Sequence, residues 1–82
     1  MPSFLRTPKE DGEIYTDATR DEIVVQIALH VGEGNEFDCL EVRKSLVGSK
    51  GEQLEKSAVI EKAKAEAVAL HAKKKEELKN KK

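Results

Sequence analysis

The chain has 82 residues, of which 38% are hydrophobic and 38% are charged, and its formal net charge is −1. A chain of this length has room for one small domain and buries only about 60% of the surface that it exposes when unfolded. Its single cysteine excludes an internal disulfide, and no stretch approaches the ~20 apolar residues of a membrane-spanning helix. We therefore expect a soluble intracellular protein, cytoplasmic or within a large assembly, whose thin core gains support from partner chains.

Charge is unevenly divided along the chain. Residues 1–50 contain 6 basic and 10 acidic side chains, whereas residues 51–82 contain 9 basic and 6 acidic ones. An acidic first part and a basic tail favour head-to-tail contact between chains, or contact of the tail with an acidic surface. We assign that acidic-surface contact to Lys73, Lys74, Lys75 and Lys79.

Residues 1–18 are predicted to form an extended N-terminal arm, because two prolines and a polar, glycine-containing cluster interrupt any regular period. Phe4 and Leu5 are adjacent apolar residues in this polar segment. They either dock onto the helices or another subunit, or belong to a free terminus that exposes two apolar side chains. We take both as candidate partner-binding residues, and we assign no more than a short strand to residues 13–16.

Residues 19–22 read Thr-Arg-Asp-Glu, the pattern of a helix capping box in which Thr19 and Glu22 satisfy each other's backbone N–H. A first helix is expected to start here and to stop at Gly32 or Gly34. The same segment also alternates apolar and other residues and is rich in β-branched side chains, which is the pattern of a strand. We prefer the helix because of the capping box.

Asn35, followed by Glu36 and Asp38, repeats a helix start signal, since Asn is a favourable N-cap and acidic residues suit the first turn. A second, shorter helix is expected to run to about Val47 and to end at Gly48. Its apolar residues fall on more than one side.

Residues 49–52 form a second Ser-x-x-Glu box, and the chain after it contains no proline and many good helix formers. A third helix is therefore expected from about residue 51 to the C-terminus. At 100° per residue, its apolar residues form two stripes on opposite sides, and a helix with two stripes needs a second surface to cover the other. The small-residue stripe contains Leu54, Ala58, Ala65, Val68, Ala69 and Ala72, and the bulkier stripe contains Val59, Ile60, Ala63, Ala67 and Leu70.

The predicted fold class is therefore all-α, with two short helices, one long C-terminal helix and the extended arm. Its divisions are an arm over residues 1–18, a three-helix mini-domain over residues 19–72 and a lysine-rich helical tail over residues 73–82. The candidate core consists of Ile23, Ile27, Phe37, Leu40, Ile60 and Leu70.

Catalytic and metal chemistry find little support in the sequence. His30, Cys39 and His71 are widely separated, and no two of them stand at a spacing diagnostic of a metal site. Adjacent acidic residues on a helix diverge and cannot share acid–base work. We expect no enzyme activity, no cofactor and no bound metal, and no role at a membrane surface.

Nucleic-acid binding is the alternative function. Three helices with short connections can form a helix-turn-helix, and the tail is rich in lysine. Against this interpretation, the third helix opens with Glu52 and Glu55 and contains no arginine, so it is poorly suited to reading bases. Loose contact of the lysine tail with nucleic acid stays open.

The sequence favours a small non-enzymatic structural or assembly protein that binds other subunits of a larger complex, such as a virion in which it is a minor component. The alternative is a small helix-turn-helix-like regulator associated with nucleic acid. We assign partner binding to an arm pair and to the small-residue stripe of the third helix. These residues are Phe4, Leu5, Leu54, Ala58, Ala65, Val68 and Ala72.

Overall fold

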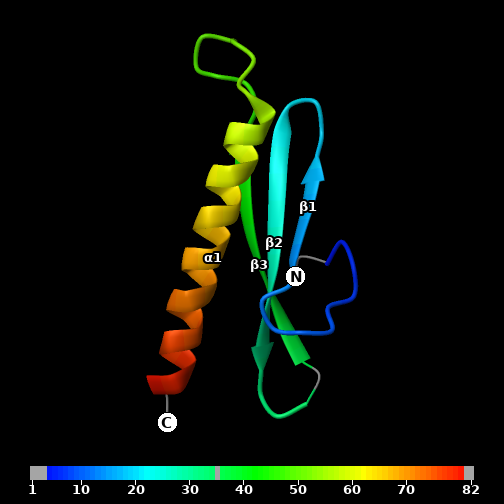
Figure 1. The fold of residues 1–82 in the computed structure, drawn as a ribbon, viewed down its shortest axis with the longest axis vertical. Coiled ribbons are helices and arrows are strands. Elements are labelled where there is room, and N and C mark those ends of the chain that lie inside the picture. Colours follow the sequence, from blue (N-terminus) through cyan, green and yellow to red (C-terminus); the bar gives the residue numbers. More distant parts are fainter. Residues whose placement is uncertain (1–3, 35, 81–82) are drawn as a thin grey trace.

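A computed structural model describes residues 4–34 and 36–80 of the chain. It contains three strands, β1 (Ile14–Ala18), β2 (Glu22–Val31) and β3 (Glu36–Ser45), followed by one helix, α1 (Lys56–Asn80). The strands form an antiparallel sheet in the order β1-β2-β3, and α1 lies along one face of it, over β2 and β3 (Figure 1). The all-α prediction with three helices is therefore wrong, because both predicted short helices are strands.

The segment predicted as the first helix is the central strand β2. Ile23, Val25, Ile27 and Leu29 alternate along it and are all buried, so the strand pattern decides and not the capping box. Thr19 and Glu22 do bond as that box requires, since the Thr19 Oγ1 accepts from the Glu22 N–H at 3.2 Å. The Thr19 N–H, however, donates to the Glu22 carbonyl at 2.9 Å, which closes a hairpin turn between β1 and β2.

The segment predicted as the second helix is strand β3. It pairs with β2 over its whole length, from Glu36 opposite Val31 to Ser45 opposite Glu22. Gly32 has a φ of 72° in the connecting turn, a conformation that residues with a side chain rarely adopt. The predicted N-cap Asn35 lies outside the described residues. Glu36 and Asp38, the acidic residues that favoured a helix start, are the first and third residues of β3.

Register divides the sheet into a face covered by α1 and an open face. Residues directly opposite each other in an antiparallel pair point to the same side. Ile23, Val25 and Ile27 of β2 therefore share the covered face with Lys44, Val42 and Leu40 of β3. The open face carries Gln26 and His30 of β2 with Glu41 and Phe37 of β3, and Tyr15 of β1 lies opposite Gln26.

The long C-terminal helix is confirmed, but it begins at Lys56 rather than near residue 51. The predicted Ser-x-x-Glu box is a loop instead, in which the Glu52 side chain accepts from the Lys50 N–H at 3.1 Å and Gly51 has a φ of 83°. Ala63 and Ala67 of α1 are fully buried against the sheet. The core cluster consists of Ile23, Val25, Ile27, Leu46, Ala63 and Ala67, with Leu40, Val42, Val59 and Ile60 packed against it.

Four of the six predicted core residues belong to this core, and the other two are only half-buried. Ile23 and Ile27 are buried in it, while Leu40 and Ile60 pack against it. Phe37 instead lies on the open face, where its ring contacts His30 edge-on at 5.3 Å between centroids. Leu70 is half-buried near the end of the helix contact.

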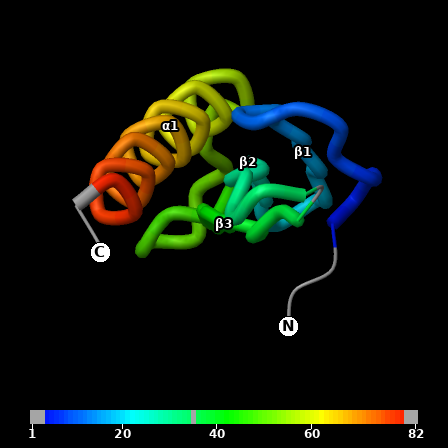
Figure 2. Tube along the Cα trace, turned by 90° about the horizontal axis from the view of Figure 1, so that it is seen from below, coloured from blue at the N-terminus to red at the C-terminus, as the bar shows by residue number. Residues whose placement is uncertain are grey.

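Phe4 and Leu5 of the N-terminal arm lie on the open face of the sheet, whereas Asp11 of the arm reaches α1. The Leu5 N–H donates to Gln26 Oε1 at 2.8 Å, and Phe4 packs edge-on against Tyr15 with ring centroids 6.1 Å apart. Gln26 is only 3% exposed and also donates to Glu41 Oε1 at 3.3 Å. The view along the long axis shows α1 over one face of the sheet and the arm on the side of β1 (Figure 2). Residues 14–18, predicted as arm, form β1 and belong to the sheet.

Candidate functional site

The outward face of α1 is the side that carries Ala58, Ala65, Val68 and Ala72, together with Leu54 just before the helix. All five residues are exposed, and Val68 is 50% exposed. Ala63 and Ala67, which lie on the opposite side of the helix, are fully buried. The structure thus places one predicted stripe in the core and leaves the other uncovered within the described residues.

Lysines of the helical tail have different surroundings. Lys75 Nζ lies 2.6 Å from Asp11 Oδ2, and Lys74 Nζ lies 3.7 Å from Glu77 Oε2. Lys73 and Lys79 are exposed and have no ion pair within residues 4–34 and 36–80. The four predicted contacts with an acidic surface therefore divide into two that already have acidic partners in the chain and two that do not.

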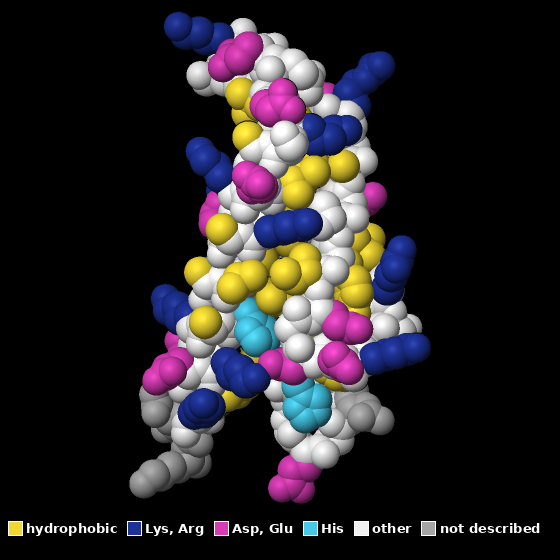
Figure 3. Space-filling model, viewed as in Figure 1, with side chains coloured by type: hydrophobic (Ala, Val, Ile, Leu, Met, Phe, Trp, Pro, Cys, Tyr) yellow, Lys and Arg dark blue, Asp and Glu magenta, His cyan; other side chains and the backbone are white. Residues whose placement is uncertain are grey.

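Asp11 joins three segments that are distant in the sequence. Its Oδ1 accepts from the backbone N–H of His30 at 2.8 Å and lies 3.0 Å from His71 Nε2. Its Oδ2 accepts from Lys75 at 2.6 Å. The carboxylate thereby ties the start of the sheet to the end of β2 and to the last turns of α1. Figure 3 shows histidine, acidic and lysine side chains gathered at the lower end of the apolar seam between α1 and the sheet.

The surroundings of Asp11 fix its charge. Partial burial alone would raise the pKa of the Asp11 carboxyl, but the hydrogen bonds from His30 N–H, Lys75 and His71 outweigh burial and hold this pKa far below its ordinary value. No sequence pattern indicated this cluster, because its members are up to 64 residues apart. We interpret it as a structural clamp between the helix and the sheet.

A second polar cluster lies on the open face beneath the arm. Tyr15 Oη donates to Glu13 Oε2 at 2.6 Å, which lowers the pKa of Glu13. Burial, followed by this hydrogen bond, raises the pKa of Tyr15 to about 12. Tyr15 therefore stays neutral at physiological pH and acts as a hydrogen-bond donor and as a support for Phe4.

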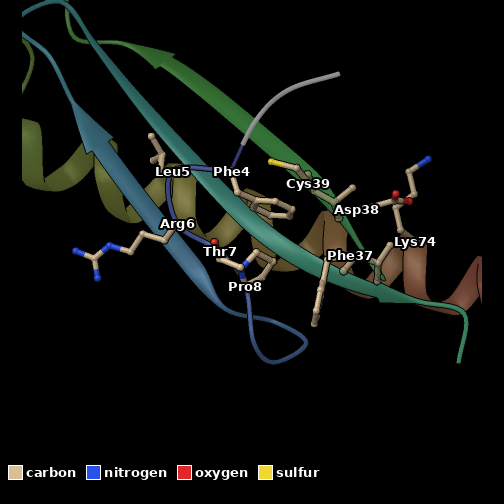
Figure 4. Close-up of a pocket in the computed structure, with 11 residues that line it drawn as sticks. Phe4, Leu5, Arg6, Thr7, Pro8, Phe37, Asp38, Cys39 and Lys74 are labelled. Atoms are coloured by element: carbon tan, nitrogen blue, oxygen red, sulfur yellow. The ribbon is translucent and has the colours of Figure 1, made fainter. Parts of the chain in front are cut away.

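An open hollow of about 800 Å³ lies between the arm and β3 (Figure 4). Residues 4–8 of the arm and residues 37–40 of β3 line it, together with Leu29 and Lys74. Phe4 is half-buried here, whereas Leu5 is 46% exposed. The arm pair predicted to bind a partner is therefore held against its own sheet, and only the Leu5 side chain of the pair is largely accessible.

The side chains of the three residues considered for metal or nucleophilic chemistry do not form one group, although Asp11 contacts both the His30 backbone and the His71 ring. His30 Nε2 lies 2.5 Å from the Gly34 carbonyl oxygen, and His71 contacts Asp11. Burial, followed by the nearby Glu41 carboxylate, raises the pKa of Cys39, which disfavours its reactive thiolate form. Among residues 4–34 and 36–80 there is no group of three or more His, Cys, Asp or Glu side chains placed to hold a metal ion.

Comparisons with protein-family models, with curated proteins and with solved structures find no match to this chain. In the part of the chain that the structure describes, no helix combines the length and the apolar character needed to cross a membrane. The candidate functional surface therefore rests on geometry alone, and the outward face of α1 is the largest group of predicted site residues that the fold brings together.

Proposed function

We propose that this chain is a small non-enzymatic assembly protein that binds another subunit of a larger complex through the outward face of α1. The proposal depends on one observation: Ala58, Ala65, Val68 and Ala72 are exposed along the helix opposite its buried residues. Small residues at this spacing allow a second helix to approach closely, at about 8–10 Å between axes. Leu5, exposed on the arm, is a secondary contact in this proposal.

The charges beside this stripe favour a protein partner. Glu61 lies within this stripe, between Ala58 and Ala65, while Lys62 lies beside the stripe and Glu76 continues it, so both signs of charge accompany the small residues. Mixed charges around an apolar centre are typical of a protein interface, whereas nucleic acid favours a single basic surface. The alternative regulator needs a helix-turn-helix, and two of its three predicted helices are strands, so we do not propose it.

Ala65 lies near the middle of the outward face, and its replacement tests the proposed function. We expect Ala65→Arg to lower the mass of the complex isolated with this chain, because the long charged side chain holds the partner helix away. Ala65→Ser keeps a small side chain and should retain the mass. Light scattering of the isolated complexes measures the effect, and circular dichroism checks that the helix content is unchanged. An unaltered mass in Ala65→Arg would contradict the proposed interface.

A further inference from the structure

The outer side of β3 is an unpaired strand edge. Ala28 accepts from the Gly12 N–H at 2.8 Å and donates to the Glu13 carbonyl at 2.9 Å, so its backbone polar groups point toward β1. Cys39 lies opposite Ala28, and alternation in an antiparallel ladder then turns the N–H and C=O of Cys39 away from β2. The same alternation applies to the odd-numbered residues from 37 to 45. Among the described residues, no strand pairs with this edge.

We infer that β3 pairs with β3 of a second copy of this chain, antiparallel and with Glu41 on the two-fold axis, so that two sheets join into one of six strands. This surface is distinct from the outward face of α1, so the inference goes beyond the proposed function. An exposed edge of ten residues is a ready template for strand pairing. A second copy fits this edge because the side chains of β3 are complementary to themselves.

The match between β3 and a second copy of β3 is clearest for the side chains on the face covered by α1. Along β3 this face carries an acid, two apolar residues and a base, namely Asp38, Leu40, Val42 and Lys44. With Glu41 on the axis, Leu40 of one copy lies opposite Val42 of the other, and Asp38 lies opposite Lys44. Both apolar and opposite-charge pairs directly across strands are stabilising. The pairing therefore continues the core and adds two symmetric ion pairs.

Two other registers fit less well. If the second strand were shifted by one residue, side chains on the covered face would lie opposite side chains on the open face. A two-fold axis normal to the sheet keeps each side chain on its own face, so this register is not permitted. A shift by two residues, with Leu40 on the axis, would place the Asp38 carboxylate opposite the apolar Val42. In the inferred register, Glu41 meets its own copy, but its carboxylate is already held by Arg43 at 3.0 Å and by Gln26 at 3.3 Å.

The side of α1 above this edge carries a second self-complementary pattern. Lys44 Nζ lies 2.5 Å from Glu66 Oε2, and Asp38 lines the same hollow as Lys74. Glu41 is midway between Lys44 and Asp38 on β3, so it is level with the helix position midway between Glu66 and Lys74, at about residue 70. An axis at that level places Lys62 opposite Glu77, and Glu66 opposite Lys73, of the second copy. Because α1 covers both β2 and β3, the two helices would run antiparallel about 10 Å apart, an ordinary packing distance.

A cysteine on the inferred axis tests both the interface and its register. In a Cys39→Ser background, Glu41→Cys puts two thiols directly opposite each other, with Cα atoms ~5.5 Å apart, which a disulfide can bridge. Mild oxidation with oxidised glutathione should convert most of this variant into a covalent dimer on a non-reducing gel. Arg43→Cys in the same background is the control, since its two thiols would be four residues apart along the strands, about 13 Å, and should not cross-link.

Sedimentation equilibrium of the unmodified chain should give twice the mass of one chain at micromolar concentrations. Lys73→Glu, at an exposed position, should weaken this dimer about tenfold at low salt, because it replaces two attractive pairs by two repulsive ones. A monomeric mass at all concentrations would overturn the inference, as would equal cross-linking of both cysteine variants. Ala65→Arg should leave this β3 dimer intact, so failure of the proposed function is distinguishable from failure of this inference.

Discussion

Replacing Ala67 with glutamate should unfold the protein. Ala67 is fully buried between α1 and the sheet, within the cluster that contains Ile23, Val25 and Ile27. A glutamate there has no room and no partner for its charge, so we expect a loss of about 4 kcal/mol or more in the free energy of unfolding. A domain of this length has only ~4–12 kcal/mol in total. Urea unfolding followed by circular dichroism measures the loss.

Ala65→Glu is the matched control for this prediction, because Ala65 lies only two residues away but on the outward face of α1. The same side chain is exposed to water at that position, and we expect a change of no more than about 0.5 kcal/mol. If both variants unfolded at similar urea concentrations, the orientation of α1 on the sheet would be wrong. The pair therefore tests the assignment of the two helix stripes independently of any partner.

Asp11→Asn should detach the end of α1 from the sheet. Asparagine can still accept from the His30 N–H, but it loses the charge that holds His71 and Lys75. We expect a loss of about 1–3 kcal/mol, mainly from the partly buried contacts, since the half-exposed Lys75 pair contributes little. Hydrogen exchange should show faster opening of the last turns of α1 than of its first turns. Uniformly unchanged exchange along α1 would contradict the clamp.

The stabilisation by Asp11 should also depend on pH. Its pKa in the folded chain lies far below the value of ~3.9 for an unfolded chain, so the unfolded state binds a proton first as the pH falls. The contribution is therefore complete above about pH 5 and is lost progressively as the pH falls below ~4 toward the folded-state pKa. The difference in unfolding free energy between the unmodified chain and Asp11→Asn should shrink over this range. A constant difference from pH 7 to pH 3 would show that the carboxylate charge is not the cause.

The two hairpins show why local signals misled the sequence interpretation. Thr19 and Glu22 can close either a helix or a tight hairpin turn, because in both the Thr19 hydroxyl accepts from the Glu22 N–H, and only the acceptor of the Thr19 N–H differs. The alternation of Ile23, Val25 and Ile27 was visible in the sequence and was the better guide. The strand β2 is stable only because it pairs with β1 and β3. These two partners are separate segments of the chain and are not part of the local sequence pattern of β2.

The clamp and the free edge could not be read from the sequence at all. Asp11 meets His71 and Lys75 only because α1 folds back along the sheet, which brings residues 60 and 64 positions apart into contact. The edge of β3 exists only because the sheet ends at that strand. Neither the Asp11 clamp nor the free edge of β3 produces a periodic pattern in the amino-acid sequence.

By itself, the sequence determined the long C-terminal helix and its two stripes, since Ala-rich composition and a 3.6-residue period are local properties of one segment. Only the tertiary structure decided that residues 22–31 and 36–45 are strands and which stripe is covered. The reason is that backbone hydrogen bonds in a helix close within a few residues, whereas those of a sheet depend on distant segments and on the layer packed against them.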